Sequence, residues 1–270
     1  MEKKRTGKKP GKDYHLHTRL CKHASGSLEE YTESAISKGI TEICFADHIP
    51  LPNGFDQHHR MELRELEIYL QLIESCQKKF PEIKILSGIE ADYIEGMEPY
   101  LQDIISSYPF DLVIMSIHFI RDWPEGQWVF NYHFPEKSLS QVYQEYFVTM
   151  IKGIRTGLFD IVGHLDLIKR PDYPVLKVNP DGVESVLKAI QEKNMGIELN
   201  TSGIRKDIGD YYPSLDLIHL IIEKGIPVTP GSDAHSPEQV GFHFTELLDA
   251  LPDNRKLKWA GYEKRKIYLG

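Results

Sequence analysis

Short apolar runs alternate with amphipathic stretches along most of the chain. Seven of the runs are four to seven residues long, which is the usual length of a buried strand. They predict strands at residues 13–18, 43–46, 83–89, 112–117, 159–162, 195–199 and 226–229. Residues 267–269 are a further candidate for an edge strand.

Between these runs, apolar residues recur at intervals of three and four, as on one face of a helix. In the first stretch Ser27 and Glu30 have capping-box spacing, and Gly39 ends the pattern. A second helix is predicted from Leu63 until Pro81. Further helices are predicted at 97–107, from Leu139 to Met150, and at 183–193, 215–223 and 237–251. Residues 121–137 lack periodicity and are predicted to form a long loop.

Regular alternation of strands and helices favours parallel βαβ units, either in a closed barrel or in an open sheet. In a barrel, chemistry gathers at the carboxyl ends of many strands, whereas in an open sheet it gathers at one switch point. Polar residues end every predicted strand here, so we predict an α/β barrel. We expect a basic tail at residues 1–12 and a single domain at residues 13–270.

Composition and charge narrow the class of protein. The 270 residues include 32 basic and 40 acidic side chains, and six of the basic ones lie in the first twelve positions. Beyond that tail 26 basic and 39 acidic side chains remain, a net of −13, which argues against an extended nucleic-acid surface. No apolar stretch predicts a membrane span or a secretory signal. Three widely spaced cysteines suggest a reducing, cytoplasmic setting.

The 12 histidines change the picture most, because imidazole is the commonest metal ligand. Seven of them lie at or just after predicted strand ends: His15, His17, His23, His48, His118, His164 and His235. Carboxylates occupy similar positions, notably Glu90 and Asp233, with Asp47, Asp92, Asp166 and Glu198 at other strand ends. His15 and His17 are two apart, so one face of a strand can present both to one ion.

Each position also has an ordinary structural interpretation. A single histidine at a strand end is often a hydrogen-bonded core residue, and Asp233 could cap the helix that follows. Cys21 is interpreted as a small, partly buried residue. Five histidines lack a strand-end context and are interpreted as structural or exposed: His58, His59, His133, His219 and His243. Seven successive strand ends with metal-ligand chemistry are much harder to explain in this way.

The nine candidates exceed the four to six ligands of one transition metal. A bridging carboxylate such as Glu90 would let two ions share a water-derived nucleophile. Imidazole with carboxylate suits Zn, Mn or Fe.

These motifs resemble the PHP (polymerase and histidinol phosphatase) superfamily, and their order most resembles the stand-alone histidinol-phosphate phosphatases. The resemblance spans residues 13–245. It rests on His15-Leu-His17-Thr18 with Cys21-x-His23, Ala46-Asp47-His48, Gly88-Ile-Glu90-Ala-Asp92, Ser116-Ile-His118, Gly163-His164-Leu-Asp166, Asn200-Thr-x-Gly203-x-Arg205 and Gly231-Ser-Asp-Ala-His235.

The resemblance implies a distorted seven-stranded (β/α)₇ barrel with three divalent transition-metal ions at its mouth. It implies one ion on His15, His17, Glu90 and Asp233. It places a second ion on Glu90, His118 and His164, and a third on His23, His48 and His235. The implied reaction is hydrolysis of L-histidinol phosphate to L-histidinol and phosphate in histidine biosynthesis, through a hydroxide bridging two metals.

Roles beyond metal binding follow from the chemistry of a phosphate monoester. Asp233 and Glu90 are the expected catalytic residues, with Asp233 carrying protons. Phosphate also needs a cationic clamp, for which Arg205 and either Lys169 or Arg170 are candidates and Arg60 a weaker one. Lys169 and its neighbour Arg170 could instead form a solvated turn. The rival functions are a PHP phosphoesterase acting on nucleotides or DNA ends, and a non-catalytic metal-binding module.

Overall fold

The computed structural model describes residues 11–251 and 256–269, and its centre is a mainly parallel sheet. In these residues the strands lie in chain order, and only the last pair, β8 and β9, is antiparallel. The strands are β1 Lys12–Leu16, β2 Glu42–His48, β3 Lys84–Asp92, β4 Leu112–Ser116, β5 Ile161–Val162, β6 Gly196–Asn200, β7 Pro227–Gly231, β8 Lys258–Glu263 and β9 Lys266–Leu269. The predicted parallel α/β architecture is confirmed.

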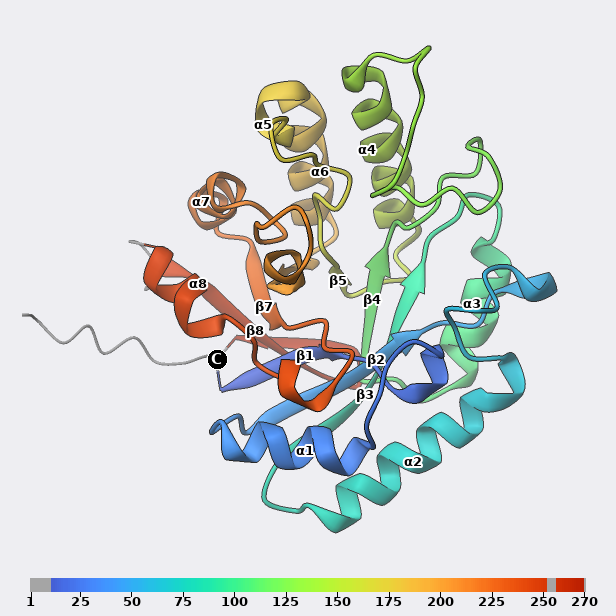
Figure 1. Ribbon diagram of the computed structural model, residues 1–270, viewed down its shortest axis with the longest axis vertical. Coiled ribbons are helices and arrows are strands. Elements are labelled where there is room, and N and C mark those ends of the chain that lie inside the picture. Colours follow the sequence, from blue (N-terminus) through green and yellow to red (C-terminus); the bar gives the residue numbers. More distant parts are fainter. Residues whose placement is uncertain (1–10, 252–255, 270) are drawn as a thin grey trace, which may run out of the picture.

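Helices surround the strands on the outside, as Figure 1 shows. They are α1 Leu28–Ser37, α2 Leu66–Lys79, α3 Glu98–Ser107, α4 Leu139–Thr156, α5 Val175–Val178, α6 Pro180–Glu192, α7 Leu215–Lys224 and α8 Phe244–Ala250. The predicted capping box of α1 is confirmed: the Ser27 amide donates to Glu30 at 2.7 Å, and the Glu30 amide donates to Ser27 Oγ at 3.3 Å. Residues 121–137 contain neither an α-helix nor a strand. Among the described residues, none of the helices has the length and apolar character to cross a membrane.

Two parts of the C-terminal region differ from the prediction. The sheet has nine strands where seven were expected, since β8 was missed and β9 covers the candidate edge strand. The helix predicted at 237–251 is shorter, because left-handed backbone at Gly241 and His243 (φ of 65° and 56°) delays its start until Phe244. Residues 252–255, which follow it, lie outside the described residues.

The first and seventh strands approach each other beyond their ladders. An isolated parallel bridge pairs Leu16 with Ala234, and the His17 amide donates to the Ala234 carbonyl at 2.9 Å. This bridge does not extend into a continuous ladder, so the nine-stranded sheet is not closed. Tail residues 1–10 lie outside the described residues, and β1 begins at Lys12.

Apolar side chains fill the inner face of the sheet toward the amino ends of the strands. One buried cluster joins Cys44, Leu86 and Ile114 to Tyr262 of β8. Because side chains alternate along a strand, residues at even spacing share a face. His48 of β2 therefore lies on the face of Cys44, and Glu90 of β3 lies on the face of Leu86. The fold thus places an apolar base beneath a polar upper layer.

Candidate metal centre

The polar layer at the carboxyl ends of the strands brings the nine predicted ligands together. Three pairs of imidazole and carboxylate atoms show how closely the elements meet. His17 Nε2 lies 3.1 Å from Asp233 Oδ1, His48 Nδ1 lies 2.7 Å from Glu90 Oε2, and His164 Nε2 lies 2.9 Å from Glu90 Oε1. The rings of His17 and His235 stack with their centroids 4.1 Å apart. The ends of six strands, β1 to β5 and β7, therefore converge on one cluster.

Glu90 lies at the centre of this cluster, with 1% of its surface exposed. Its Oε1 accepts from Ser116 Oγ at 2.6 Å and lies 3.8 Å from His118 Nε2. Its Oε2 lies 3.5 Å from His15 Nε2 and 3.7 Å from His17 Nε2. Thus the two oxygens face different sets of imidazoles, which is the arrangement of a bridging carboxylate.

Hydrogen bonds to the outer ring nitrogens fix how the imidazoles point. His15 Nδ1 lies 2.6 Å from Glu198 Oε1, and His118 Nδ1 lies 2.9 Å from Asp92 Oδ1. A carboxylate can only accept, so each Nδ1 carries a proton, and in the neutral ring each Nε2 presents a lone pair to the cluster. Glu198 and Asp92 were noted only as strand-end residues in the sequence. Their position behind a histidine is what assigns them this tethering role.

The outer pair of histidines shows most clearly that a cation fits here. His23 Nδ1 donates to the Cys21 carbonyl at 2.7 Å, and His235 Nδ1 donates to the Asp233 carbonyl at 3.0 Å. When both rings are neutral, both Nε2 atoms are unprotonated, and they lie 2.9 Å apart. Two lone pairs at this distance repel each other unless a positive ion lies near both.

Other buried atoms in the cluster also make no hydrogen bond, even though Glu90 Oε2 and His48 Nδ1 lie 2.7 Å apart. Glu90 Oε2, His48 Nδ1 and His164 Nδ1 are buried and make no hydrogen bond, although buried polar atoms are nearly always satisfied. Five groups of three ligand atoms lie within 4.8 Å of one another: His15, His17 and Asp233; His48, Glu90 and His118; His17, His48 and His235; Cys21, His23 and His235; and His17, Cys21 and Asp47. His48 belongs to two of these groups. The Cys21 side chain, expected to be partly buried, is fully buried beside the ligands.

The imidazoles of the cluster divide into two kinds: burial would lower the pKa of His15, His17 and His118, but nearby carboxylates raise it, whereas His48 and His235 are held neutral. Burial lowers the pKa of the His48 imidazole to about 4 and that of His235 to about 2, so both are neutral at pH 7. Burial alone would raise the pKa of the Glu90 carboxyl, but His48 and its neighbours lower it well below its usual range. The carboxyl of Asp233 is likewise lowered, despite its burial, by His15, His17 and Lys206.

Backbone conformation is unusual at two of these side chains. Asp233 and His164 have φ values of 52° and 21°, a region that residues other than glycine rarely occupy. Asp233 follows β7, and His164 follows β5. Such backbone concentrates at functional sites, where the surrounding contacts hold it in place.

Comparison with known proteins identifies the family. The PHP domain model matches residues 13–202, and the model described as PHP-associated matches residues 219–257. The chain belongs to the PHP family. Within it, the chain is 35% identical over 244 residues to a probable histidinol-phosphatase of Deinococcus radiodurans, covering 89% of this chain and 92% of the relative. It is 30% identical over 273 residues to the histidinol-phosphatase of Bacillus subtilis, covering 88% and 98%.

A solved structure supports the same PHP fold. Histidinol phosphate phosphatase from Lactococcus lactis, solved with zinc, L-histidinol and phosphate, superimposes with a TM-score of 0.77 at 23% identity, covering 95% of this chain and 98% of that one. The resemblance of the sequence motifs to the PHP superfamily is therefore confirmed.

Among the candidates for the cationic clamp, Arg205 has an unused donor, whereas Lys169 and Arg60 are engaged with other groups. Arg205 Nη2 donates to the Ser232 and Asp233 carbonyls at 2.9 Å each, while its buried Nη1 has no hydrogen-bond partner. The unused donor therefore belongs to a side chain held beside Asp233, a predicted metal ligand, as a phosphate clamp requires.

Lys169 and Arg60 are engaged elsewhere. The Lys169 ammonium binds Asp166 at 3.2 Å, Asp210 at 2.8 Å and the Tyr211 carbonyl, which together use its three donors. Arg60 is 1% exposed and binds the Ile49 carbonyl, Asp56 and Asp92. These contacts favour structural roles over the substrate-binding roles expected for both. Arg170 donates to the Tyr132 carbonyl at 2.6 Å, and its guanidinium lies over the Tyr132 ring. The alternative in which Lys169 and Arg170 form a solvated turn is therefore wrong.

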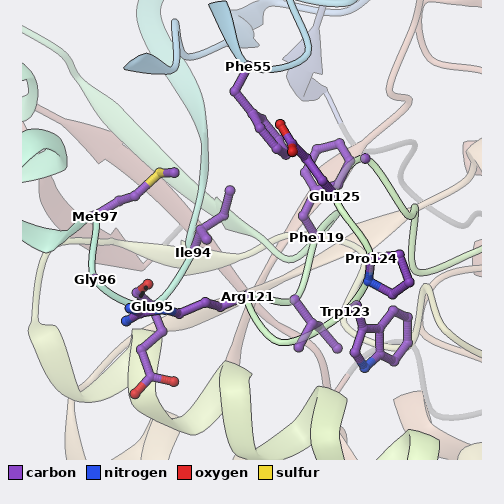
Figure 2. A pocket seen from close by; sticks show the side chains of 12 residues that line it. Phe55, Ile94, Glu95, Gly96, Met97, Phe119, Arg121, Trp123, Pro124 and Glu125 are labelled. Atoms are coloured by element: carbon purple, nitrogen blue, oxygen red, sulfur yellow. Dashed lines mark hydrogen bonds between the residues drawn. The ribbon is translucent and has the colours of Figure 1, made fainter. Parts of the chain in front are cut away.

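A cavity of about 360 Å³ lies beside the centre rather than within it. Its walls include Phe55, Met97, Phe119 and Trp123, as Figure 2 shows, and none of the nine predicted ligands lines it. Phe119, which lines the cavity, directly follows His118 in the chain, and their rings lie 6.5 Å apart.

Proposed function

We propose that this protein is a metal-dependent histidinol-phosphatase that hydrolyses L-histidinol phosphate to L-histidinol and inorganic phosphate. The observation that carries phosphoester hydrolysis is Glu90, a buried ionised carboxylate whose two oxygens face different imidazoles. The substrate rests on full-length similarity to proteins named histidinol-phosphatase.

We propose that the nine clustered side chains hold three divalent transition-metal ions. The first set is His15, His17, Glu90 and Asp233; the second is Glu90, His118 and His164; and the third is His23, His48 and His235. The groups within 4.8 Å support parts of each set. Zinc fits the imidazole and carboxylate donors, as do manganese and iron. When bound, such ions neutralise phosphoryl oxygens and lower the pKa of a bound water.

The side chains then have distinct tasks in the reaction. Arg205 Nη1 binds a phosphoryl oxygen, because it is the unused donor beside the ligands. Asp233, held ionised, takes a proton from the attacking water and passes it to the departing alkoxide. Its Oδ1 lies 3.1 Å from His17 Nε2, which fixes the carboxylate beside the reacting phosphate.

The finer architecture is also a proposal. We infer that β1 to β7 form the distorted seven-stranded barrel, with its seam at the bridge between Leu16 and Ala234. We also infer a cytoplasmic location, which the three buried, unpaired cysteines support. We propose a catalytic domain of 13–270 preceded by a basic tail at 1–12, with Lys12, the last residue of that range, already part of β1.

The deciding experiment compares phosphate release from L-histidinol phosphate, a nucleoside monophosphate and an aryl phosphate. We expect kcat/KM to be highest for L-histidinol phosphate, to vanish after chelation and to return with Zn²⁺ or Mn²⁺. Equal rates on all three esters would leave a PHP phosphoesterase of broad specificity. No hydrolysis after metal restoration would instead indicate a metal-binding module.

A further inference from the structure

Two aromatic side chains outside the ligand set lie against the rings of proposed ligands. The His59 ring is 5.5 Å from the His23 ring, and the Trp128 ring is 5.4 Å from the His118 ring. His59 and Trp128 are themselves 5.3 Å apart and nearly perpendicular, at 88°. They therefore complete an unbroken series of ring contacts from the end of β1 to the end of β4, along the rim of the metal centre.

His59 is held in one orientation by buried groups. Its Nδ1 lies 2.6 Å from Asp56 Oδ1, and Asp56 Oδ2 accepts from Arg60 Nη2 at 2.8 Å. The same Arg60 nitrogen donates to Asp92 at 3.1 Å, and Asp92 tethers His118. One hydrogen-bonded chain thus fixes both the rim histidine and a proposed metal ligand. This explains why Arg60 is buried instead of facing the phosphate.

The orientation leaves His59 with a free acceptor. Because Asp56 can only accept, Nδ1 carries a proton, and in the neutral ring Nε2 presents a lone pair. The His59 side chain is 44% exposed, so Nε2 can reach a ligand at the rim.

Trp128 supplies a rigid aromatic surface beside it. Its ring packs on Phe119 at 4.6 Å, and Phe130, which is 52% exposed, extends the same surface at 5.1 Å. Aromatic faces attract cations and flat heteroaromatic rings. The rim therefore combines a flat apolar face with a hydrogen-bond acceptor, next to the site proposed for phosphate.

We propose that Trp128 and His59 form the subsite for the leaving group. This subsite selects a flat nitrogen heterocycle that bears an amine. The Trp128 face packs on the imidazole of the substrate, and His59 Nε2 accepts a hydrogen bond from its ammonium. Asp56 and Arg60 are positioning residues that hold His59. This assignment rests on the proposed function, since it names how the same site selects its substrate.

The test measures selectivity with three phosphate esters. L-Histidinol phosphate carries the ring and the ammonium, O-phosphoethanolamine carries only the ammonium, and glycerol 3-phosphate carries neither. We expect Trp128→Leu to lower kcat/KM for L-histidinol phosphate roughly 10-fold to 100-fold and to have little effect on the other two esters. His59→Ala should lower it about 10-fold for the first two esters but not for glycerol 3-phosphate.

Two further readouts separate binding from folding. Inhibition by the product L-histidinol should weaken by the same factor as kcat/KM, while the metal content by elemental analysis stays at the wild-type value. Trp128→Phe, which keeps an aromatic face, should retain most of the selectivity. Matched controls are Tyr173→Leu, an aromatic side chain that is 51% exposed, and His133→Ala, an exposed histidine of the 121–137 loop, and both should behave as wild type.

The outcomes distinguish this inference from the function on which it rests. Wild-type protein that turned over the three esters equally would contradict the proposed function itself. A wild-type preference for L-histidinol phosphate that survives both Trp128→Leu and His59→Ala would overturn the subsite alone. Equal losses on all three esters, accompanied by loss of metal, would also overturn it, because the rings would then only support the metal centre.

Discussion

The two ends of the sheet both bury charge, but they satisfy it differently. At the amino end, Glu42 accepts from Tyr14 at 2.7 Å and from Tyr268 at 2.8 Å and pairs with Lys12 at 3.1 Å. Asp160 there accepts from the Val113 amide and from the Arg265 guanidinium. Each buried carboxylate at this end therefore has protein donors.

At the carboxyl end, acceptors face acceptors. His23 Nε2 faces His235 Nε2, and Glu90 Oε2 makes no hydrogen bond although it is buried among imidazoles. Burial of a polar group without a partner costs roughly 1–3 kcal/mol, so folding alone does not account for this layer. The contrast separates charge that stabilises the fold from charge arranged to bind ions.

The substitution with the largest expected effect on this contrast is Glu90→Gln. The substitution keeps the shape of the side chain but removes the charge that faces both imidazole sets. We expect kcat to fall on the order of 10³-fold or more and the metal content to fall with it. Thermal unfolding of the metal-free protein should change little. A variant that kept its metals and its kcat would show that Glu90 is an ordinary buried acid.

Arg205→Ala comes next, because it removes the unused donor beside Asp233. Loss of one donor to a developing phosphoryl charge lowers kcat/KM about 100-fold. Arg205→Lys should recover only part of this, since lysine lacks the planar fork. Lys169→Met is the informative comparison: its ammonium is already engaged, so we expect lost stability with the KM for phosphate esters retained. A larger rise in KM for Lys169→Met than for Arg205→Ala would reverse the two assignments.

The sequence predicts this carboxyl end better than the amino end. The ligands follow strand ends, and a strand fixes which face its side chains share, so Glu90 and His48 could be placed without coordinates. The partners of Lys169 could not, because Asp210 and Tyr211 lie 41 and 42 residues farther along and meet it only in the folded chain. The β8 strand was missed because it contains Gly261, which weakens a strand pattern.

A smaller effect concerns the pH dependence of stability. The pKa of His48 is lowered to about 4 by burial, whereas in the unfolded chain it is near 6.5. Between these values the unfolded state binds more protons, so the contribution of His48 is complete above pH 6.5 and is lost as the pH falls toward 4. The free energy of unfolding can be measured with urea on the metal-free protein at pH 7 and at pH 5. We expect the difference between the two pH values to be about 2 kcal/mol smaller in His48→Gln than in the wild type.

The control for that experiment is His133→Gln, which changes an exposed histidine. It should leave the pH dependence as in the wild type. An unchanged slope in His48→Gln would mean that the imidazole is not desolvated as its burial indicates, and the carboxyl end would then resemble the solvated surface more than a closed metal site.

The smallest effect is expected at the amino end, in Arg265→Met. Lys264 and Arg265 form the left-handed turn between β8 and β9, and the guanidinium lies 2.9–3.2 Å from the two oxygens of Asp160. The Arg265 side chain is 29% exposed, so solvent weakens this pair and its removal should cost about 1 kcal/mol in urea unfolding. Because the Val113 amide still donates to Asp160, kcat/KM should stay at the wild-type value. Loss of activity without loss of stability would show that the hairpin acts on the metal centre through the strands, and the two ends would no longer be independent.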